Sequence, residues 1–341
     1  MSGDFTWRDA GRTVVFRRGG VGARVEVLRK HGIGEFALLS TERALAGAEA
    51  LAEVAGTVHE VPAGQVPAAA APLMGALAPQ AGEGVQVRPL VALGGGRVID
   101  VAKAIASVSG ANVIAIPTTL SGAEMTGFHR LPAGAEPRAR GMVRPVLVIA
   151  DPEAMTSQPE AELRASSMNA LAHGADTLYL PLSNPVSEMT ALRGAELIAQ
   201  ALDREPGRRD RAGLALGSLL CGYAIDAAGM GLHHLVCQTL VRVCGTPHAG
   251  TNAAILPHAA GFLAGRAPEG FEALADVLGT ERSGLADRIE ELGRPPRLDD
   301  VGGDSSKLGE AIEAMLQRPE LQRVPRPPSR AELAELIAKA W

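Results

Sequence analysis

Aromatic side chains are scarce in this sequence of 341 residues, at 3% of all positions. Positive charge is not in excess either, because the formal net charge is −5 and no long run of Lys or Arg occurs. Nucleic-acid binding usually requires a basic face for the phosphates and aromatic platforms for the bases. We therefore expect no nucleic-acid partner.

Long apolar runs and an even set of cysteines are also missing. No window contains the roughly 18 apolar residues of a membrane span, and the stretch up to Gly20 lacks the apolar core of a signal peptide. The three cysteines, Cys221, Cys237 and Cys244, fit a reducing compartment better than a disulfide framework. We expect a cytoplasmic protein without a membrane partner, and with Cys237 and Cys244 packed in its core.

Apolar runs alternate with amphipathic segments over the first half of the sequence. Strands are predicted within 13–20, 35–41, 58–62, 89–96, 112–119 and 144–152, and helices over 21–32, over 43–56, from 66 and from 99. This alternation is typical of βαβ units and a mostly parallel sheet. After Asp151 and Pro152 the pattern becomes almost wholly helical. We expect a parallel α/β domain over residues 1–152 and a helical domain over residues 153–341.

A glycine triplet marks a candidate anion site. The sequence LGGGRVIDVAKAIA, residues 93–106, follows an apolar strand and begins a helix. Glycines let the backbone approach a ligand closely, and a helix N-terminus directs free N–H groups at an anion. Thr118 and Thr119 follow the next strand, and neighbouring strand ends of a parallel sheet form the crevice where nucleotides bind. These patterns predict a diphosphate site; the alternatives are a plain strand-to-helix turn and hydroxyls that only cap the next helix.

Five segments, in this order and spacing, resemble one known family: GGGRVIDVAKAIA, PTTLSGAEMT, VIADP, MNALAHGADTLY and LHHLVCQTLVRVCGTPHAGTNAAILPHA. They are similar to the group III, or iron-containing, alcohol dehydrogenases, and in particular to the maleylacetate reductase branch. The resemblance implies a dehydroquinate-synthase-like architecture. Residues 1–152 would form a Rossmann-like dinucleotide-binding domain and residues 153–341 an all-α substrate and catalytic domain, with the active site in the cleft between them.

The resemblance also implies an activity. Family members are commonly homodimers that use NADH or NADPH. In the maleylacetate branch the substrate is an oxo-acid with a conjugated alkene, and maleylacetate is reduced to 3-oxoadipate during the degradation of aromatic compounds. The chain is therefore expected to be an NAD(P)H-dependent oxidoreductase that acts on a small, carboxylate-bearing molecule.

The metal site of the family is altered in this chain. Metal-dependent relatives hold iron or zinc with one Asp and three His, and these positions fall on Asn169, His173, His234 and His248. Replacing the carboxylate by Asn169 removes the negative charge that helps to retain a cation. Where the family has His-His-x-x-x-His, the third position here is Gln238, which cannot take up a proton at neutral pH. The branch that also carries Asn works without metal, and the same is expected here.

Without a metal, another group must stabilise the negative charge that hydride transfer places on oxygen. His234 and His248 are the candidate proton donors. Asn169 and His173, four residues apart and so on one face of a helix, are expected to orient the substrate. The candidate supporting histidines are His233 and His258, and the candidate cationic partners for a substrate carboxylate are Arg130, Arg138, Arg140 and Arg242.

The residues predicted to contact the cofactor are Ser40, Gly94, Gly95, Gly96, Arg97, Val98, Asp100, Thr118, Thr119, Met155 and Thr156. Arg97 stands where the family usually has Ser after the glycines, and Ala123 replaces a Ser near the cofactor. Members that prefer NAD often place an Asp after the second strand, where this chain has Ser40 and Thr41. Both NADH and NADPH therefore stay open.

Three other interpretations stay open at this point. Arg97, Ala123 and Gln238 are compatible with a member of the same fold that catalyses a non-redox lyase, cyclisation or dehydration reaction in a biosynthetic pathway. A metal-dependent alcohol dehydrogenase with an altered site is the second interpretation. A non-catalytic nucleotide-binding subunit is the third.

Overall fold

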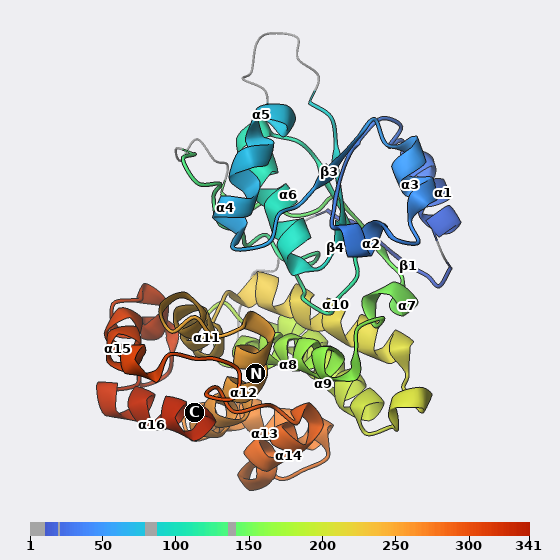
Figure 1. Ribbon diagram of the computed structural model, residues 1–341. Coiled ribbons are helices and arrows are strands. Elements are labelled where there is room, and N and C mark those ends of the chain that lie inside the picture. The colour runs from blue at the N-terminus through green and yellow to red at the C-terminus, as the bar shows by residue number, and fades with distance from the viewer. Residues whose placement is uncertain (1–10, 20, 79–86, 136–140) are drawn as a thin grey trace. The chain divides into compact units, whose positions relative to one another are not determined.

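The computed structural model describes residues 11–19, 21–78, 87–135 and 141–341 (Figure 1). The chain divides into two compact units. The first contains the described residues up to Ser157, and the second is Gln158–Trp341.

The first unit is built on one six-stranded sheet. Its strands are β1 (Thr13–Phe16), β2 (Ala37–Ser40), β3 (Thr57–Glu60), β4 (Leu90–Gly94), β5 (Val113–Pro117) and β6 (Leu147–Ala150). They lie in the order β1-β6-β5-β4-β2-β3, and all neighbouring pairs are parallel. The four inner strands are buried at every position, as expected when helices cover both faces of a parallel sheet. The predicted parallel α/β fold is confirmed.

The helices of this unit are α1 (Val21–Lys30), α2 (Glu42–Leu45), α3 (Glu49–Val54), α4 (Val66–Ala70), α5 (Met74–Leu77), α6 (Gly96–Ser109) and α7 (Pro152–Met155). Two apolar clusters form the core, one on each face of the sheet, because successive strand residues point to opposite faces. Leu39 and Ala92 join α4 and α6 in one cluster. Leu38 and Val91 join α1 and α3 in the other.

Two helices that the sequence predicts as single elements are interrupted. The predicted helix 43–56 is formed by α2 and α3, because Gly47 between them has a φ of +84°, which a helix does not contain. The helix predicted from Val66 becomes α4, a 3₁₀ turn η1 (Ala71–Leu73) and α5. Pro72 lies in the first turn of η1 and has no N–H for a longer helix.

The unit boundary lies after Ser157, whereas the sequence patterns place it after Pro152. Asp151 caps α7 by accepting a hydrogen bond from the N–H of Glu153 at 3.1 Å. The same carboxylate forms an ion pair with Arg24 of α1 at 3.4 Å. These contacts tie the segment after β6 to the first unit.

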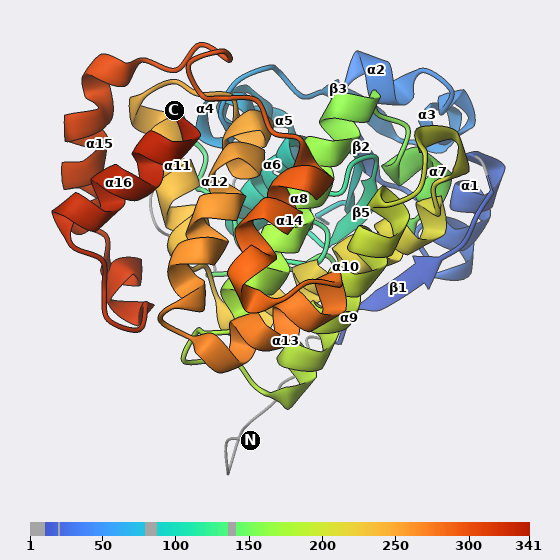
Figure 2. The ribbon, with the colours of Figure 1, turned by 90° about the horizontal axis from the view of Figure 1, so that it is seen from below.

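The second unit is helical throughout Gln158–Trp341, which the structure describes without a gap. Its α-helices are α8 (Glu160–Thr177), α9 (Pro185–Leu202), α10 (Arg211–Ala228), α11 (Leu232–Val243), α12 (His248–Ala264), α13 (Pro268–Leu278), α14 (Leu285–Gly293), α15 (Leu308–Leu316) and α16 (Arg330–Ala340). Short 3₁₀ turns join several of them: η2 (Pro206–Arg208), η3 (Arg282–Gly284), η4 (Ser305–Lys307) and η5 (Pro319–Arg323). Within this unit α12 is flanked by α11, α14 and α16 (Figure 2).

Helices α8, α9 and α10 pack closely because glycines occur where they meet. A Cβ atom added at Gly194 would lie 2.6 Å from the Sγ of Cys221 and 2.8 Å from the carbonyl oxygen of Gly217. Cys221, Cys237 and Cys244 are all buried and free, so the predicted packing of Cys237 and Cys244 in the core is confirmed.

Among the described residues, no single helix has the length and apolar composition of a membrane span. Helices α10 and α11 meet these criteria only together, and they are bent by 96° at the break between them.

Candidate active site

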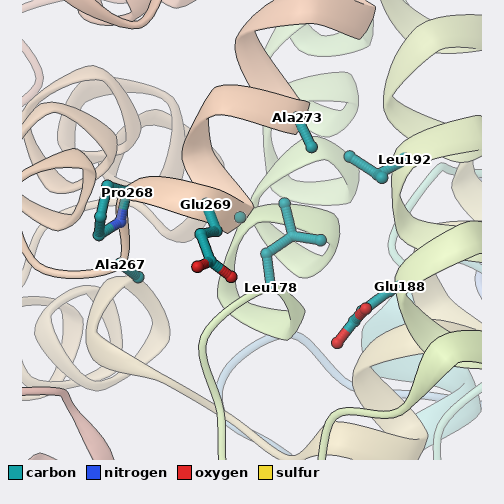
Figure 3. Close-up of a pocket in the computed structure, with 8 residues that line it drawn as sticks. Leu178, Glu188, Leu192, Ala267, Pro268, Glu269 and Ala273 are labelled. Atoms are coloured by element: carbon teal, nitrogen blue, oxygen red, sulfur yellow. The ribbon is translucent and has the colours of Figure 1, made fainter. Parts of the chain in front are cut away.

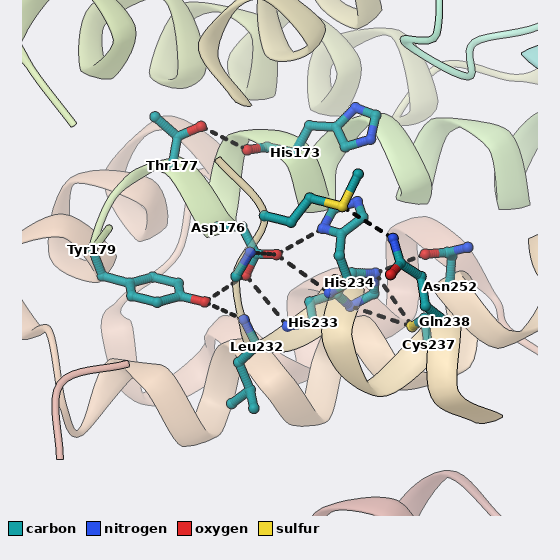
Figure 4. Close-up of polar contacts among 12 residues, drawn as sticks. His173, Asp176, Thr177, Tyr179, Leu232, His233, His234, Cys237, Gln238 and Asn252 are labelled. Atoms are coloured by element: carbon teal, nitrogen blue, oxygen red, sulfur yellow. Dashed lines mark hydrogen bonds and ion pairs between the residues drawn. The ribbon is translucent and has the colours of Figure 1, made fainter. Parts of the chain in front are cut away.

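Helices α8 and α11 bring two of the predicted histidines together in the helical unit (Figure 4). The rings of His173 and His234 stack with centroids 4.8 Å apart and an angle of 18° between their planes. The ring of His233 contacts His234 edge-on, with centroids 5.0 Å apart. All three side chains are buried, so the cluster is shielded from water.

Asp176 accepts five hydrogen bonds, four from the N-terminal end of α11 and one from Tyr179 (Figure 4). The Nδ1 of His234 donates to its Oδ2 at 2.7 Å, and the hydroxyl of Tyr179 donates to its Oδ1 at 2.8 Å. The backbone N–H groups of Gly231, His234 and His233 donate over 3.2, 3.3 and 3.4 Å. Burial raises the pKa of the Asp176 carboxyl, but the hydrogen bond and charge of His234 outweigh it and lower the pKa. The carboxylate is therefore ionised.

Tyr179 extends this network. Its hydroxyl also accepts a hydrogen bond from the backbone N–H of Leu232 at 2.5 Å, and its ring packs against Phe271. Burial and the Asp176 charge raise the pKa of Tyr179 well above its ordinary value. Tyr179 is therefore a neutral donor.

His233 belongs to a second, inert group of contacts. Its Nε2 lies 3.0 Å from the Oδ1 of Asn252, and the Nδ2 of Asn252 donates to the carbonyl of His248 at 2.7 Å. Cys237 Sγ is 3.6 Å from His233 Nε2. Burial raises the pKa of the Cys237 thiol well above its ordinary value and lowers that of His233 to about 3. This Cys, His and Asn grouping therefore packs and supports the cluster and is not an activated nucleophile.

Two ring nitrogens of the stacked pair have no hydrogen-bond partner among the described residues. They are Nδ1 of His173 and Nε2 of His234, and both are buried. Burial, followed by the neighbouring His234 and His233, lowers the pKa of His173 well below its ordinary value, so that its ring is neutral. Buried polar atoms without partners are rare in native proteins, and a ligand is one explanation for them.

The other predicted catalytic residues surround this pair less tightly. Asn169 is buried on α8, one turn before His173. His248 is the first residue of α12 and is exposed, although its charge acts on the pKa of His173 and of His233. His258 interacts with Glu290 and with residues of the last helix, so it belongs to the packing of α12 against α14 and α16. That His258 supports the ring cluster stays a prediction.

At the four positions that the family resemblance assigns to a metal, this chain has no carboxylate. These positions hold one amide and imidazoles, and the nearby carboxylate of Asp176 is saturated by five donors. Within the described ranges, no group of three or more His, Cys, Asp or Glu side chains is arranged to hold a metal ion.

The glycine triplet joins β4 to α6 in the first unit. The N–H of Thr118 donates to the carbonyl of Gly94 at 3.0 Å, which places the ends of β4 and β5 side by side. A Cβ at Gly95 would lie 3.0 Å from Cγ2 of Thr119, and one at Gly96 would lie 2.9 Å from Cβ of Ser121. Because these residues are glycines, the turn packs closely against the loop after β5, beside the N-terminus of a 14-residue helix, where N–H groups can bind an anion. This arrangement fits a diphosphate.

Several residues predicted to contact the cofactor instead have side chains directed into the protein. Ser40 donates to the carbonyl of Leu93 at 2.8 Å, and Thr156 donates to the carbonyl of Pro152 at 2.7 Å. Val98 and Met155 are buried in apolar surroundings. The side chains at these four positions are thus used within the unit, and their contact with a cofactor stays a prediction.

Arg97 and Asp100 lie on the first turns of α6. Arg97 is exposed, and Asp100 forms an ion pair with the buried Lys103 at 2.7 Å. Lys103 also donates to the carbonyls of Ala123 and Thr126 at 3.0 and 3.1 Å, which fastens the loop after β5 to α6. The ion pair thus gives Asp100 a structural partner.

The predicted arginines have different surroundings. Arg130 donates to Gln65 at 2.9 Å in the first unit, and Arg242 is exposed in the last turn of α11. Arg138 and Arg140 lie outside the described residues. Arg318, which the sequence analysis did not single out, donates to Oε1 of Gln238 at 3.3 Å, one helical turn from His234.

A cavity of about 370 Å³ lies elsewhere in the helical unit (Figure 3). It is lined by Leu178, Glu188, Leu192, Ala267, Pro268, Glu269, Gly270 and Ala273. None of these residues carries an imidazole, a thiol or a cation, so the ring cluster is the better candidate for chemistry.

Sequence reasoning missed Asp176 and Tyr179 as members of the site. The signal was present, because both follow His173 within two turns of the same predicted helix. Their partners are 53 to 58 residues away on α11, which no local pattern reveals.

A glycine turn between a parallel strand and a helix, together with a buried histidine cluster in a helical unit, is expected of a dinucleotide-dependent enzyme. Residues 164–341 match the family model for the C-terminal part of the Fe-containing alcohol dehydrogenase family, and residues 15–159 match the model for iron-containing alcohol dehydrogenase. The chain belongs to the iron-containing alcohol dehydrogenase family and is an NAD(P)H-dependent oxidoreductase.

Its relatives include the maleylacetate reductase of Rhizobium sp. (strain MTP-10005), 31% identical over 99% of this chain and 97% of that protein. Maleylacetate reductase 1 of Rhodococcus opacus is 34% identical over 74% of this chain and 72% of its own. The crystal structure of maleylacetate reductase from Agrobacterium tumefaciens covers 100% of this chain and 99% of its own, with a TM-score of 0.85 and 29% identity. The family resemblance and the fold class predicted from the sequence are confirmed.

Proposed function

We propose that this chain is a metal-independent, NAD(P)H-dependent reductase of an unsaturated oxo-dicarboxylate, and that it converts maleylacetate to 3-oxoadipate. The observation that carries the proposal is the stacked pair of His173 and His234, with a buried nitrogen on each ring that lacks a partner among the described residues. The relatives support the same substrate, since curated proteins 31 and 34% identical to this chain are maleylacetate reductases.

The glycine turn is the proposed seat of the cofactor diphosphate. Gly95 and Gly96 let the turn pack closely against the loop after β5 at the N-terminus of α6, where N–H groups stabilise an anion. When bound, the dihydronicotinamide would supply the hydride for the alkene carbon β to the ketone, which would leave an enolate for this chain to protonate at the α carbon. Ser40 and Thr41 place no acidic residue after the second strand, so that either NADH or NADPH is compatible.

His234 is the proposed proton donor to the resulting enolate. Asp176 is bonded to its Nδ1, so that its Nε2 is the nitrogen available to the substrate. The proton would pass to the substrate from this nitrogen. His173 is neutral and would hydrogen-bond the substrate, with Asn169 one turn away, while His248 is the alternative donor.

Metal independence is part of the proposal. Asn169 offers an amide where metal-dependent relatives have a carboxylate, and Asp176 has its oxygens occupied by donors. Gln238 is bonded to Met230 and Arg318 and cannot replace an imidazole. Hydrogen-bond donors around the stacked rings are therefore proposed to stabilise the negative charge on the substrate oxygen in place of a metal.

The two substrate carboxylates require cationic or N–H partners. Arg242 and Arg318 are the proposed partners in the helical unit, because Arg242 lies about two turns after His234 on α11 and Arg318 donates to Gln238, one turn after His234. The assembly is proposed to be a homodimer, as the family resemblance implies.

The test is turnover of maleylacetate with NADH and with NADPH, followed by the loss of absorbance of the reduced nicotinamide and by identification of 3-oxoadipate. We expect one equivalent of cofactor oxidised per equivalent of product. If the protein binds the cofactor but does not turn over maleylacetate, the proposed substrate is wrong. If it binds neither cofactor in a fluorescence titration, a non-redox member of the fold is favoured.

A further inference from the structure

We infer that Asp176 is a positioning residue that sets the tautomer and the orientation of His234, so that the ring presents Nε2 to the substrate. The predicted effect on kcat rests on the proposed function, whereas the predicted proton on Nδ1 of His234 does not. Asp176 is not one of the four residues that the family resemblance assigns to the metal site.

The two oxygens of Asp176 are held by different donors. Oδ2 accepts hydrogen bonds from Nδ1 of His234 and from the N–H groups of Gly231 and His234, at 2.7, 3.2 and 3.3 Å. Oδ1 accepts from the hydroxyl of Tyr179 and the N–H of His233, at 2.8 and 3.4 Å. Rotation of the carboxylate would break bonds at both oxygens, so its position relative to the ring of His234 is fixed.

The carboxylate of Asp176, a residue of α8, caps the N-terminus of α11. An N-cap residue usually supplies its own side-chain acceptor, but the N-cap of α11 is Gly231, which has none. A Cβ at Gly231 would lie 2.6 Å from Oδ1 of Asp176. The glycine thus leaves space for a carboxylate from α8, and the anion at the helix N-terminus is favoured by the helix dipole.

The carboxylate of Asp176 determines which ring nitrogen of His234 carries a proton. Every other partner of Asp176 donates a hydrogen bond to it, so the carboxylate is also the acceptor of the 2.7 Å bond and Nδ1 of His234 carries its proton. Nε2 is then the nitrogen without a partner among the described residues, as is observed. His173, three residues before Asp176 on α8, stacks on the face of the same ring. Two residues of α8 therefore contact the ring of His234, His173 at its face and Asp176 at its edge.

The direct test is NMR of the wild-type protein with ¹⁵N-labelled histidine rings. The signals of His234 are assigned by their loss in His234→Gln. We expect a proton on Nδ1 of His234, read from the nitrogen shifts and the one-bond coupling. Nδ1 without a proton would overturn the inference, and this reading requires neither a variant of Asp176 nor any turnover.

Three variants separate positioning from capping. Asp176→Ala removes the acceptor, and we expect His234 to lose its fixed Nδ1 proton and kcat to fall about 100-fold, with the NADH affinity unchanged. Tyr179→Phe removes the hydroxyl that donates to Oδ1 of Asp176 and accepts from the N–H of Leu232, and it is expected to keep the Nδ1 proton, because Oδ2 keeps its donors. Asp176→Glu keeps a carboxylate and is expected to recover part of kcat. Asp203→Asn, in an exposed ion pair with Arg288, is the matched control and should match the wild type.

The outcomes distinguish this inference from the proposed function. If the wild type does not turn over maleylacetate but His234 carries its proton on Nδ1, the substrate is wrong and the positioning role stands. If the wild type is active and Asp176→Ala has the same kcat and the same ring signals, the positioning role is wrong.

Discussion

Replacing Glu124 with Gln is expected to stabilise the protein above pH 7 and to flatten the dependence of its stability on pH. Glu124 lies in the loop after β5 and is fully buried. Neither carboxyl oxygen has a hydrogen-bond partner among the described residues. Burial raises the pKa of Glu124 to about 7, against the lowering effects of its own backbone N–H and of the Lys103 and Arg12 charges, while Asp100 raises it further.

The size of the effect follows from proton linkage. The pKa rises from 4.5 in the unfolded chain to about 7 in the folded protein, so the native state keeps a proton that the unfolded state releases between these values. Stability from this group is therefore present at low pH and is lost as the pH rises toward 7. At about 1.4 kcal/mol for each pH unit, the free energy of unfolding of the wild type falls by about 3 kcal/mol by pH 7. The neutral Gln side chain does not titrate, so the variant does not lose this amount.

Guanidinium unfolding at several pH values between 5 and 8.5 measures this difference. We expect Glu124→Gln to exceed the wild type by an amount that grows with pH and levels off above 7. Glu53→Gln, at an exposed position on α3, controls for the loss of one carboxylate. A difference between Glu124→Gln and the wild type that is the same at every pH would refute the reasoning.

Four further outcomes are expected. Gly96→Ala places a Cβ 2.9 Å from Cβ of Ser121 and should weaken NADH binding about tenfold or more in a fluorescence titration; unchanged affinity would contradict the diphosphate cradle. His234→Asn should lower kcat about 100-fold while NADH affinity is kept, and full activity would exclude His234 as the donor. Gly194→Ala brings a Cβ within 2.6 Å of Cys221 Sγ and should destabilise the protein by about 1–3 kcal/mol, measured by calorimetry, with partial recovery when Cys221 is also changed to Ala. Elemental analysis of protein purified without chelator should find no stoichiometric iron or zinc, and activity should survive EDTA; one bound metal per chain with loss of activity on chelation would argue for the metal-dependent alternative.

The sequence alone was enough to predict the parallel α/β unit, the glycine turn and the helical second half. These features depend on local patterns: the alternation of apolar runs, glycines between a strand and a helix, and the four-residue spacing of Asn169 and His173. Such patterns act over one or two turns, and the residues that produce them are adjacent in the chain. The family resemblance added the pairing of His173 with His234 across distant helices.

Only the tertiary structure decided which polar groups are used within the protein. Ser40 follows a strand as a cofactor residue would, yet its hydroxyl is bonded to Leu93, 53 positions away. Asp176 looks like an ordinary helix residue, yet its carboxylate caps α11 and bonds to His234, 58 positions away. Hydrogen bonds of this kind form only after the elements have packed, because the fold, and not the local sequence, brings donor and acceptor within 3 Å.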